Sequence, residues 1–239
     1  MKYLIDKATQ QRIAQRIDNA VERVLSELTN HGGEEALTAV LGHALMQQSL
    51  VQDDLKVTFR YRQLNRQTEE PHAGADGGFI VRVSNSNTSV QKAALFQAKL
   101  LRGAVKVRQL TMTRREAGRL QHQTSEMLRQ TDQSVAMFYT LKQIYIVDAN
   151  DYNSMLSAGA QRPLSDKHRL ITLGTYLGQW LPRCTKGDTS ADLIQKISHQ
   201  DGFKSRLTMD VVSSRPSIAS SEDSSEAEWR GRNRRGSKP

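Results

Sequence analysis

Several features that mark other classes of protein are scarce or missing in this chain. Its 239 residues include one cysteine, Cys184, which excludes an internal disulfide and is typical of a reducing compartment. No run approaches the ~18–20 apolar residues that a membrane-spanning helix needs. The first residues, Met1 to Asp6, become polar at once and lack the apolar core of a signal peptide. We therefore expect a cytoplasmic protein without a membrane partner.

Familiar catalytic motifs are missing as well. The sequence contains no Walker A loop, no Rossmann glycine pattern and no HExxH, which argues against nucleotide-dependent motors and zinc proteases. The hydrophobic content of 37% is low for a compact globule and indicates that part of the chain is not packed. The length fits one domain, which usually holds ~100–200 residues, together with a tail.

The N-terminal part of the chain has helical periodicity. Apolar residues recur at helical spacing from Asp6 to Leu28, which predicts an amphipathic helix, and Asn30 to Gly33 ends it. A second helix is expected from Glu34 to about Gln48. From Leu55 the pattern changes to alternating apolar and polar residues, as in a half-buried strand.

The middle of the chain predicts a hairpin followed by a helix and further strand. Two apolar segments, 77–83 and 93–100, are separated by the turn-forming residues 84–88. A helix is expected from about Arg114 to Thr131, one or two strands from Val135 to Val147, and a short helix or mixed segment over residues 170–181. The order is helix, strand, strand, strand, helix, strand, in which the first helix precedes a meander.

The C-terminal composition differs sharply from the rest. Residues 213–239 hold eight serines, an acidic patch and a basic end, with Trp229 as the only aromatic residue, so this segment cannot bury enough surface to order itself. We predict three parts: an N-terminal amphipathic helix in residues 1–30, one domain in residues 31–212 and a disordered tail in residues 213–239.

One acidic residue before a strand, and a polar pair on the next strand, form the most informative pattern. Asp76 opens the first segment of the hairpin, and the second segment ends in Gln97-Ala98-Lys99. Because side chains alternate along a strand, Gln97 and Lys99 point to the same face. An oxygen ligand and an ammonium would then stand side by side, one hairpin away from a carboxylate. Asp76 alone is more typical of a turn residue, and Gln97 with Lys99 alone could be the solvent face of an edge strand.

This spacing and the order of elements resemble the restriction-endonuclease-like family, the PD-(D/E)xK nucleases, over roughly residues 34–147. The resemblance implies an α/β (α+β) fold: a restriction-endonuclease-like core with a central mixed sheet of about four or five strands flanked by helices, here with an additional N-terminal helix and a disordered tail. It also implies metal-dependent hydrolysis of phosphodiester bonds in DNA, in restriction or anti-phage defence, with a partner protein or as a homo-oligomer. RNA remains an alternative substrate.

The resemblance assigns a magnesium or manganese site. Asp76, Gln97 and the backbone carbonyl of Ala98 would hold Mg²⁺ or Mn²⁺, because these ions take oxygen ligands. Lys99 would orient the attacking water or stabilise the developing charge. The sequence departs from the family where Gln97 replaces the usual carboxylate, which removes a negative charge, and where Ala75 replaces proline before the aspartate.

Two further residues belong to the expected site. Glu34 lies in line with the apolar stripe of the second helix, which directs its carboxylate toward the core side. In the family a glutamate often comes from the helix before the sheet, so the resemblance implies that Glu34 is a further metal ligand and catalytic residue. Glu34 and Glu35 could instead complement the positive end of that helix, and Glu35 is the second choice. In the family a glutamine of the helix after the third strand often faces the site, and Gln123 is the candidate for this supporting role.

Positive charge is concentrated next to this pattern. The formal net charge is +9, and a basic balance favours a polyanionic partner. From Lys99 to Arg119 there are seven basic residues against one acid, Glu116. A charge run alone is usually a solvated face, but its position beside the expected site favours a phosphate-binding surface. The predicted nucleic-acid contacts beyond Lys99 are Arg102, Lys106, Arg108, Arg114, Arg115 and Arg119.

Two other functions remain open. Because Gln97 is neutral, the chain could be a catalytically weakened module that keeps the nuclease fold and binds nucleic acid or assembles a defence complex. It could also be an interaction protein whose basic window meets an acidic partner.

Overall fold

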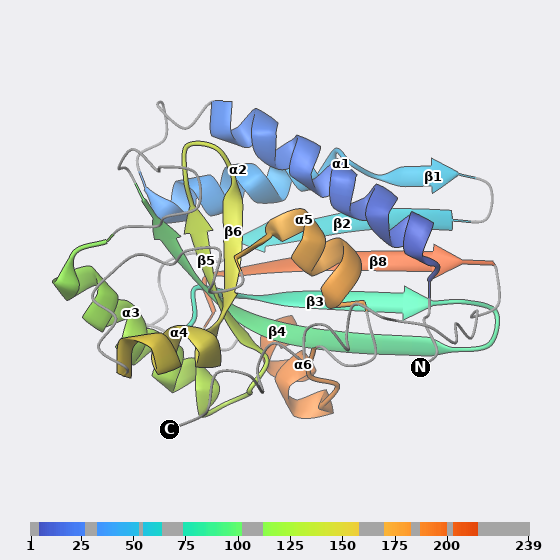
Figure 1. Cartoon of the computed structure of the whole chain (residues 1–239). Helices are drawn as coiled ribbons and strands as arrows, with labels where there is room; N and C mark the ends of the chain where they lie inside the picture. The colour runs from blue at the N-terminus through green and yellow to red at the C-terminus, as the bar shows by residue number, and fades with distance from the viewer. Residues whose placement is uncertain are drawn as a thin grey trace, which may run out of the picture.

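A computed structural model of the chain describes residues 5–26, 33–52, 55–63, 74–101, 112–157, 170–182, 187–199 and 203–214. In these residues one mixed sheet is flanked by helices on both faces, so the predicted mixed α/β class is confirmed (Figure 1). None of the helices described is long and apolar enough to cross a membrane.

The sheet is larger than predicted, with eight strands instead of four or five. Their order is β1-β2-β8-β3-β4-β5-β6-β7, in which β3 with β8 and β4 with β5 are parallel pairs and the other neighbours are antiparallel. In Figure 1 β5 and β6 are steeply inclined to β2, β8 and β3, as the twist of a large sheet requires. The strands are β1 (Leu50–Gln52), β2 (Leu55–Gln63), β3 (Gly77–Ser84), β4 (Ser89–Leu100), β5 (Ser134–Tyr139), β6 (Ile144–Asp148), β7 (Ile171–Thr172) and β8 (Ser205–Ser213).

The predicted meander is wrong at one position, because β8 lies between β2 and β3. It pairs antiparallel with β2 along its whole length and parallel with β3. Leu207, Met209 and Val211 alternate toward the core and are 6% exposed or less. This strand ends at the boundary that composition placed near Val212, and its partners are more than 120 residues earlier in the chain, so no local pattern indicates the pairing.

The helices form one layer on each face of the sheet. On the first face α1, α2 and α5 pack over apolar residues of β2, β3, β4 and β5, and Figure 1 shows α1 and α5 crossing this near side. On the second face α6 packs on β3 and β4, and α3 and α4 pack on β5. The helices are α1 (Lys7–Ser26), α2 (Glu34–Met46), α3 (Arg114–Leu128), α4 (Ala149–Ser157), α5 (Leu173–Thr175) with the π-helical turn η3 (Tyr176–Trp180), and α6 (Ala191–His199).

Local signals predicted most of the early elements. The helices α1 and α2, the strand β2 and the β3–β4 hairpin lie where the periodicity placed them, and residues 135–147 form two strands. α3 begins at Arg114 because Thr113 and Glu116 form a capping box. Residues 170–181 are a mixed segment of β7, α5 and η3. The elements β1, α4, α6 and β8 were not predicted, and the predicted tail beyond Ser214 lies outside the described residues.

The apolar stripe of α1 is buried in the core of the molecule. Ile13, Ile17, Val21 and Val24 are 2% exposed or less and belong to the main core cluster, where α1 contacts α2, α5 and η3. An amphipathic N-terminal helix suggests a docking surface for a partner, but here its apolar face already has its partner in the same chain.

Candidate active site

Four elements bring charged side chains to one end of the sheet. Asp76 directly precedes β3, Gln97 and Lys99 lie near the end of β4, Glu34 begins α2, and Lys204 directly precedes β8. Gln97 and Lys99 stand opposite Ala136 and Phe138 of β5, whose side chains pack under α3 and α4. The two side chains therefore share one face of the sheet, as the alternation predicted, and that face is the second one.

Asp76 is the centre of this group. Its Oδ2 accepts hydrogen bonds from the amide of Gln97 and from the backbone N–H of Ala98 at 3.0 Å, and its Oδ1 accepts from Nζ of Lys204 at 3.3 Å. Its own backbone is also fixed: its N–H donates to the carbonyl of Phe96, and its carbonyl accepts from the N–H of Lys204 and of Ser205. Asp76 thus joins β3 to β4 and β8, and its orientation depends on the insertion of β8.

Burial disfavours the ionised form of Asp76. Its side chain is 15% exposed, and burial raises its pKa, although the charges of Lys204 and Lys99 and the N–H of Ala98 act in the opposite direction. The raised pKa means that the surroundings do not fully compensate the negative charge. Additional positive charge at this position, from a cation, would stabilise the ionised carboxylate.

Each of the two lysines pairs with a different glutamate at the start of α2. Nζ of Lys99 lies 3.4 Å from Oε2 of Glu34, whose other oxygen accepts from the N–H of Leu100 at 3.0 Å. Nζ of Lys204 lies 3.2 Å from Oε1 of Glu35 as well as close to Asp76. Burial lowers the pKa of Lys204, but the charges of Asp76 and Glu35 outweigh it, so the pKa is raised. Glu34 and Glu35 therefore both belong to the site.

Gln97 lies between two possible metal-ligand atoms, Oδ2 of Asp76 and the carbonyl oxygen of Ala98. It is 2% exposed, and its Nε2 contacts both Oδ2 of Asp76 and, at 3.3 Å, the carbonyl oxygen of Ala98. The amide nitrogen thus lies at the point where these two oxygens converge. A half-turn of the terminal amide would turn Oε1 instead of Nε2 toward these two oxygens, because the two ends of an amide have nearly the same shape.

These oxygens fit a hard cation. A carboxylate, a backbone carbonyl and an amide oxygen are the ligands that Mg²⁺ and Ca²⁺ take in proteins, and Mg²⁺ usually keeps several waters beside them. Among the residues described, no three His, Cys, Asp or Glu side chains group around one point. A metal ion held between these oxygens would therefore depend on Gln97 and Ala98 besides Asp76.

The third helix brings the remaining predicted residues only partly to the site. Oε1 of Gln123 is buried and has no hydrogen-bond partner in the described part of the chain. The backbone carbonyl of Gln123 packs on Gly74, which lies two residues before Asp76. Gly74 has a φ of +66°, and a Cβ added to it would lie 2.5 Å from that carbonyl oxygen. Arg114, Arg115 and Arg119 are exposed on α3, whereas Arg102, Lys106 and Arg108 lie outside the described residues.

Lys204 is the site residue that sequence reasoning missed. It lies 128 positions after Asp76 and reaches it only because β8 is inserted beside β3. A single lysine before an unpredicted strand carries no local signal. The alternation of apolar residues from Ser205 to Ser213 could have indicated the strand, although not its place in the sheet.

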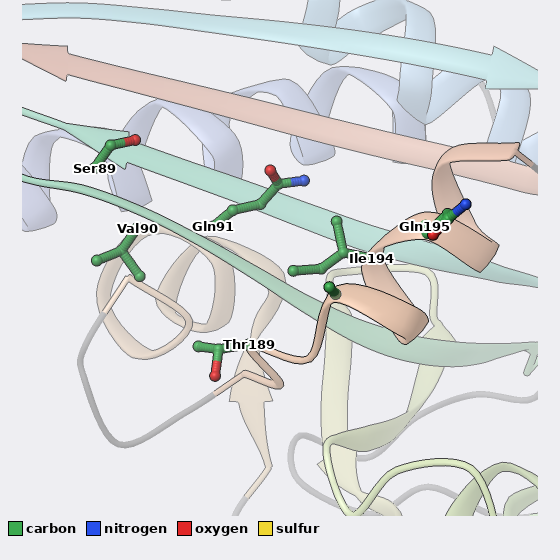
Figure 2. A pocket seen from close by; sticks show the side chains of 7 residues that line it. Ser89, Val90, Gln91, Thr189, Ile194 and Gln195 are labelled. Atoms are coloured by element: carbon green, nitrogen blue, oxygen red, sulfur yellow. The ribbon is translucent and has the colours of Figure 1, made fainter.

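A surface pocket lies elsewhere, between the start of β4 and α6. Figure 2 shows its lining side chains, which come from β4, α6 and the residues just before α6. They offer hydroxyl, amide and aliphatic groups but no charged group. Gln91 is six residues before Gln97 on the same strand, about 20 Å away at ~3.3 Å per residue. This pocket is therefore not part of the charged site. It is lined by Ser89, Val90, Gln91, Thr189, Ala191, Ile194 and Gln195.

Comparison with models of protein families, with curated proteins and with solved structures finds no match to the chain. Three carboxylates and two lysines form ion pairs in the site: Lys204 pairs with both Asp76 and Glu35, and Lys99 pairs with Glu34. Such an arrangement suits a ligand that carries both a cation and an anion, because each can replace one protein partner.

Proposed function

We propose that the protein is a metal-dependent nuclease that hydrolyses phosphodiester bonds in DNA, on a restriction-endonuclease-like core. The observation that carries the proposal is the convergence of Asp76, Gln97 and Ala98, with Lys204 in contact with Asp76 and Lys99 paired with Glu34. The sequence motif predicts that Asp76 lies close to the Gln97-Ala98-Lys99 segment. The contacts of Asp76 with Gln97 and Ala98 are consistent with that motif.

The arrangement of the strands supports the same fold. The helix α2 precedes the hairpin β3–β4, and α3 connects β4 to the parallel strand β5. This order puts Glu34, Asp76 and the Gln97-Ala98-Lys99 segment at neighbouring element ends. The additional strand β8 is accommodated between β2 and β3 without separating β3 from β4.

The roles of the side chains follow from their charges. Asp76, Gln97, the carbonyl of Ala98 and Glu34 would hold Mg²⁺ or Mn²⁺. When bound, the ion would polarise the scissile phosphate and lower the pKa of a bound water. Lys99, which is 13% exposed, would leave Glu34 for a phosphate oxygen and stabilise the charge that develops there. The positive charge of Lys204 would stabilise the ionised form of Asp76.

The biological setting rests on the family resemblance. We propose a role in restriction or anti-phage defence, with a partner protein or a second copy of the chain. DNA is the preferred substrate and RNA the alternative.

Cleavage of plasmid DNA in the presence of Mg²⁺ or Mn²⁺ tests the proposal. Asp76→Ala and Lys99→Ala should each abolish cleavage. The matched controls are Asp132→Ala and Lys142→Ala, which remove the same charges at exposed positions and should cleave like the wild type. Cleavage that survives both site substitutions would reject the site.

A catalytically weakened module that binds nucleic acid is the second candidate. The observation that favours it is the hydrogen bond from the Gln97 amide to Oδ2 of Asp76, which engages one of the proposed metal-ligand atoms within the protein. Salt-dependent DNA binding by the wild type, with no cleavage under Mg²⁺ or Mn²⁺, would select this candidate.

A further inference from the structure

The second face of the sheet continues beyond the candidate site as a row of arginines. Cross-strand partners share a face, and on this face Arg62 stands opposite Arg206 and Arg60 opposite Thr208. On the other side of β8, Arg82 stands opposite Asp210. We call Arg60, Arg62, Arg82 and Arg206 the arginine face. None of them belongs to the basic window that the sequence indicated.

This face is contiguous with the candidate site. Arg206 lies two residues after Lys204 on the same chain segment, about 7 Å along the strand at ~3.3 Å per residue. Arg62 is beside Arg206 on the neighbouring strand, about 4.8 Å away in the direction of the strand hydrogen bonds. A chain of phosphates whose scissile bond lies at Asp76 would therefore pass directly onto these side chains.

Two residues of the arginine face, Arg60 and Arg62, are exposed, and the other two, Arg82 and Arg206, are half-buried. Among the elements described, α2 is the helix that packs extensively on β2, and it lies on the first face, while α6 covers β3 and β4. The side chains of Arg60 and Arg82 are 62% and 40% exposed. Arg206 is partly covered because its guanidinium donates to the carbonyl of Ser198 near the end of α6.

Negative charge on this face is small. Among the residues described, Asp210 is the one carboxylate that pairs with the four arginines, at 2.6 Å from Arg60 and 3.6 Å from Arg82. Burial lowers the pKa of Arg206, and the charges of Arg62, Arg82 and Arg60 lower it further. The four guanidinium groups thus repel one another, and an external anion would relieve that repulsion.

We infer that the arginine face binds the phosphate backbone of the DNA that flanks the scissile bond. Arginine is suited to this role because its fork of N–H groups matches phosphate oxygens. The extended row of charges favours a linear polyanion over a single anion. The inference rests on the proposed function for the choice of DNA, and its test measures binding separately from cleavage.

The test compares two triple variants of the full chain that lose the same charge. Arg60→Gln/Arg62→Gln/Arg82→Gln changes the arginine face and leaves Arg206, which contacts α6, unchanged. Arg12→Gln/Arg16→Gln/Arg23→Gln changes exposed positions of α1 on the first face and is the control. Binding of a fluorescent DNA duplex is measured against salt concentration by anisotropy, with EDTA present so that no cleavage occurs.

Loss of three phosphate contacts should lower the slope of log K against log salt by about 2.7, at about 0.9 per contact. The control should keep most of the wild-type slope. Asp210→Asn should bind DNA more tightly than the wild type, because it frees Arg60 and Arg82 from their carboxylate. Circular dichroism of each variant checks that the fold is retained.

Different outcomes overturn different claims. Equal losses in the two triple variants, or no loss in either, would overturn the arginine face as a specific surface. The inference also fails if the wild type binds polyglutamate but no DNA at low salt. Binding through the arginine face without cleavage under either Mg²⁺ or Mn²⁺ would support the inference and refute the nuclease function.

Discussion

Replacing Gln97 by glutamate restores the carboxylate that is usual in the resembling family and gives the sharpest test of the site. In Gln97→Glu a carboxylate oxygen takes the place of the nitrogen that donates to Oδ2 of Asp76. Two unit charges about 4 Å apart repel each other by about 4 kcal/mol at an effective dielectric constant of about 20. The lost hydrogen bond to a charged group adds roughly 1.5–3 kcal/mol.

The loss of stability should depend on pH in a defined direction. Burial already raises the pKa of Asp76, and a second carboxylate beside it would raise the pKa of the pair further. The folded state would then hold a proton that the unfolded state releases. The contribution of the pair is therefore favourable at low pH and is lost as the pH rises above the ordinary carboxyl range near 4. We expect a decrease in unfolding free energy of at least about 4 kcal/mol near pH 8 and a smaller one near pH 5.

Urea denaturation with EDTA or with Mn²⁺ measures both effects. Mn²⁺ at about 100 times its dissociation constant should restore about 2.7 kcal/mol to the variant. The controls are Gln97→Met, which loses the hydrogen bond without adding charge, and Gln11→Glu, which adds the same charge at an exposed position of α1. A Gln97→Glu protein whose stability depends on neither pH nor Mn²⁺ would refute the convergence of Gln97 and Asp76.

Further substitutions test the neighbours of Gln97. Asp76→Asn should reduce cleavage to background yet raise the thermal midpoint near pH 8, because it removes a carboxylate whose pKa is raised by burial. The gain in thermal midpoint should shrink as the pH falls toward 4. A variant that is less stable than the wild type at every pH would contradict this. Lys204→Met should shift the acidic limb of the pH–rate profile upward, since Lys204 favours the ionised Asp76, whereas Lys196→Met on α6 should leave the profile unchanged. Gly78→Ala should lose roughly 1–3 kcal/mol in urea denaturation, because its Cβ would lie 2.6 Å from Ile197; Ile197→Ala in the same chain should relieve this clash, and additive losses in the double variant would argue against the packing.

Local periodicity predicted the parts of the site that are close in sequence. Alternation along β4 placed Gln97 and Lys99 on one face, and the helical stripe of α2 directed Glu34 toward the sheet. The hairpin that joins β3 to β4 brought Asp76 beside Gln97 because its turn fixes the register. These predictions needed only the direction of side chains within an element and one short connection.

The polar face of β2 was also visible in the sequence, but its neighbours were not. Arg60 and Arg62 alternate with Phe59 and Tyr61, which indicated one wet face. That this face continues through Arg206 to the candidate site depends on β8. Sequence separation alone made this pairing unpredictable, because any exposed strand edge would have suited the hydrogen bonds of β8.

The chemical groups and their local directions follow from the amino-acid sequence: an aspartate before one strand, a glutamine and a lysine on one face of the next, and a glutamate at the start of a helix. Which of these groups meet depends on the packing of distant elements. Insertion of β8 between β2 and β3 brings Lys204 to Asp76 and Arg206 to Arg62. The physical reason is that side-chain direction follows from the two-residue and 3.6-residue periods of a single element, whereas the pairing of distant strands follows from the packing of the whole core.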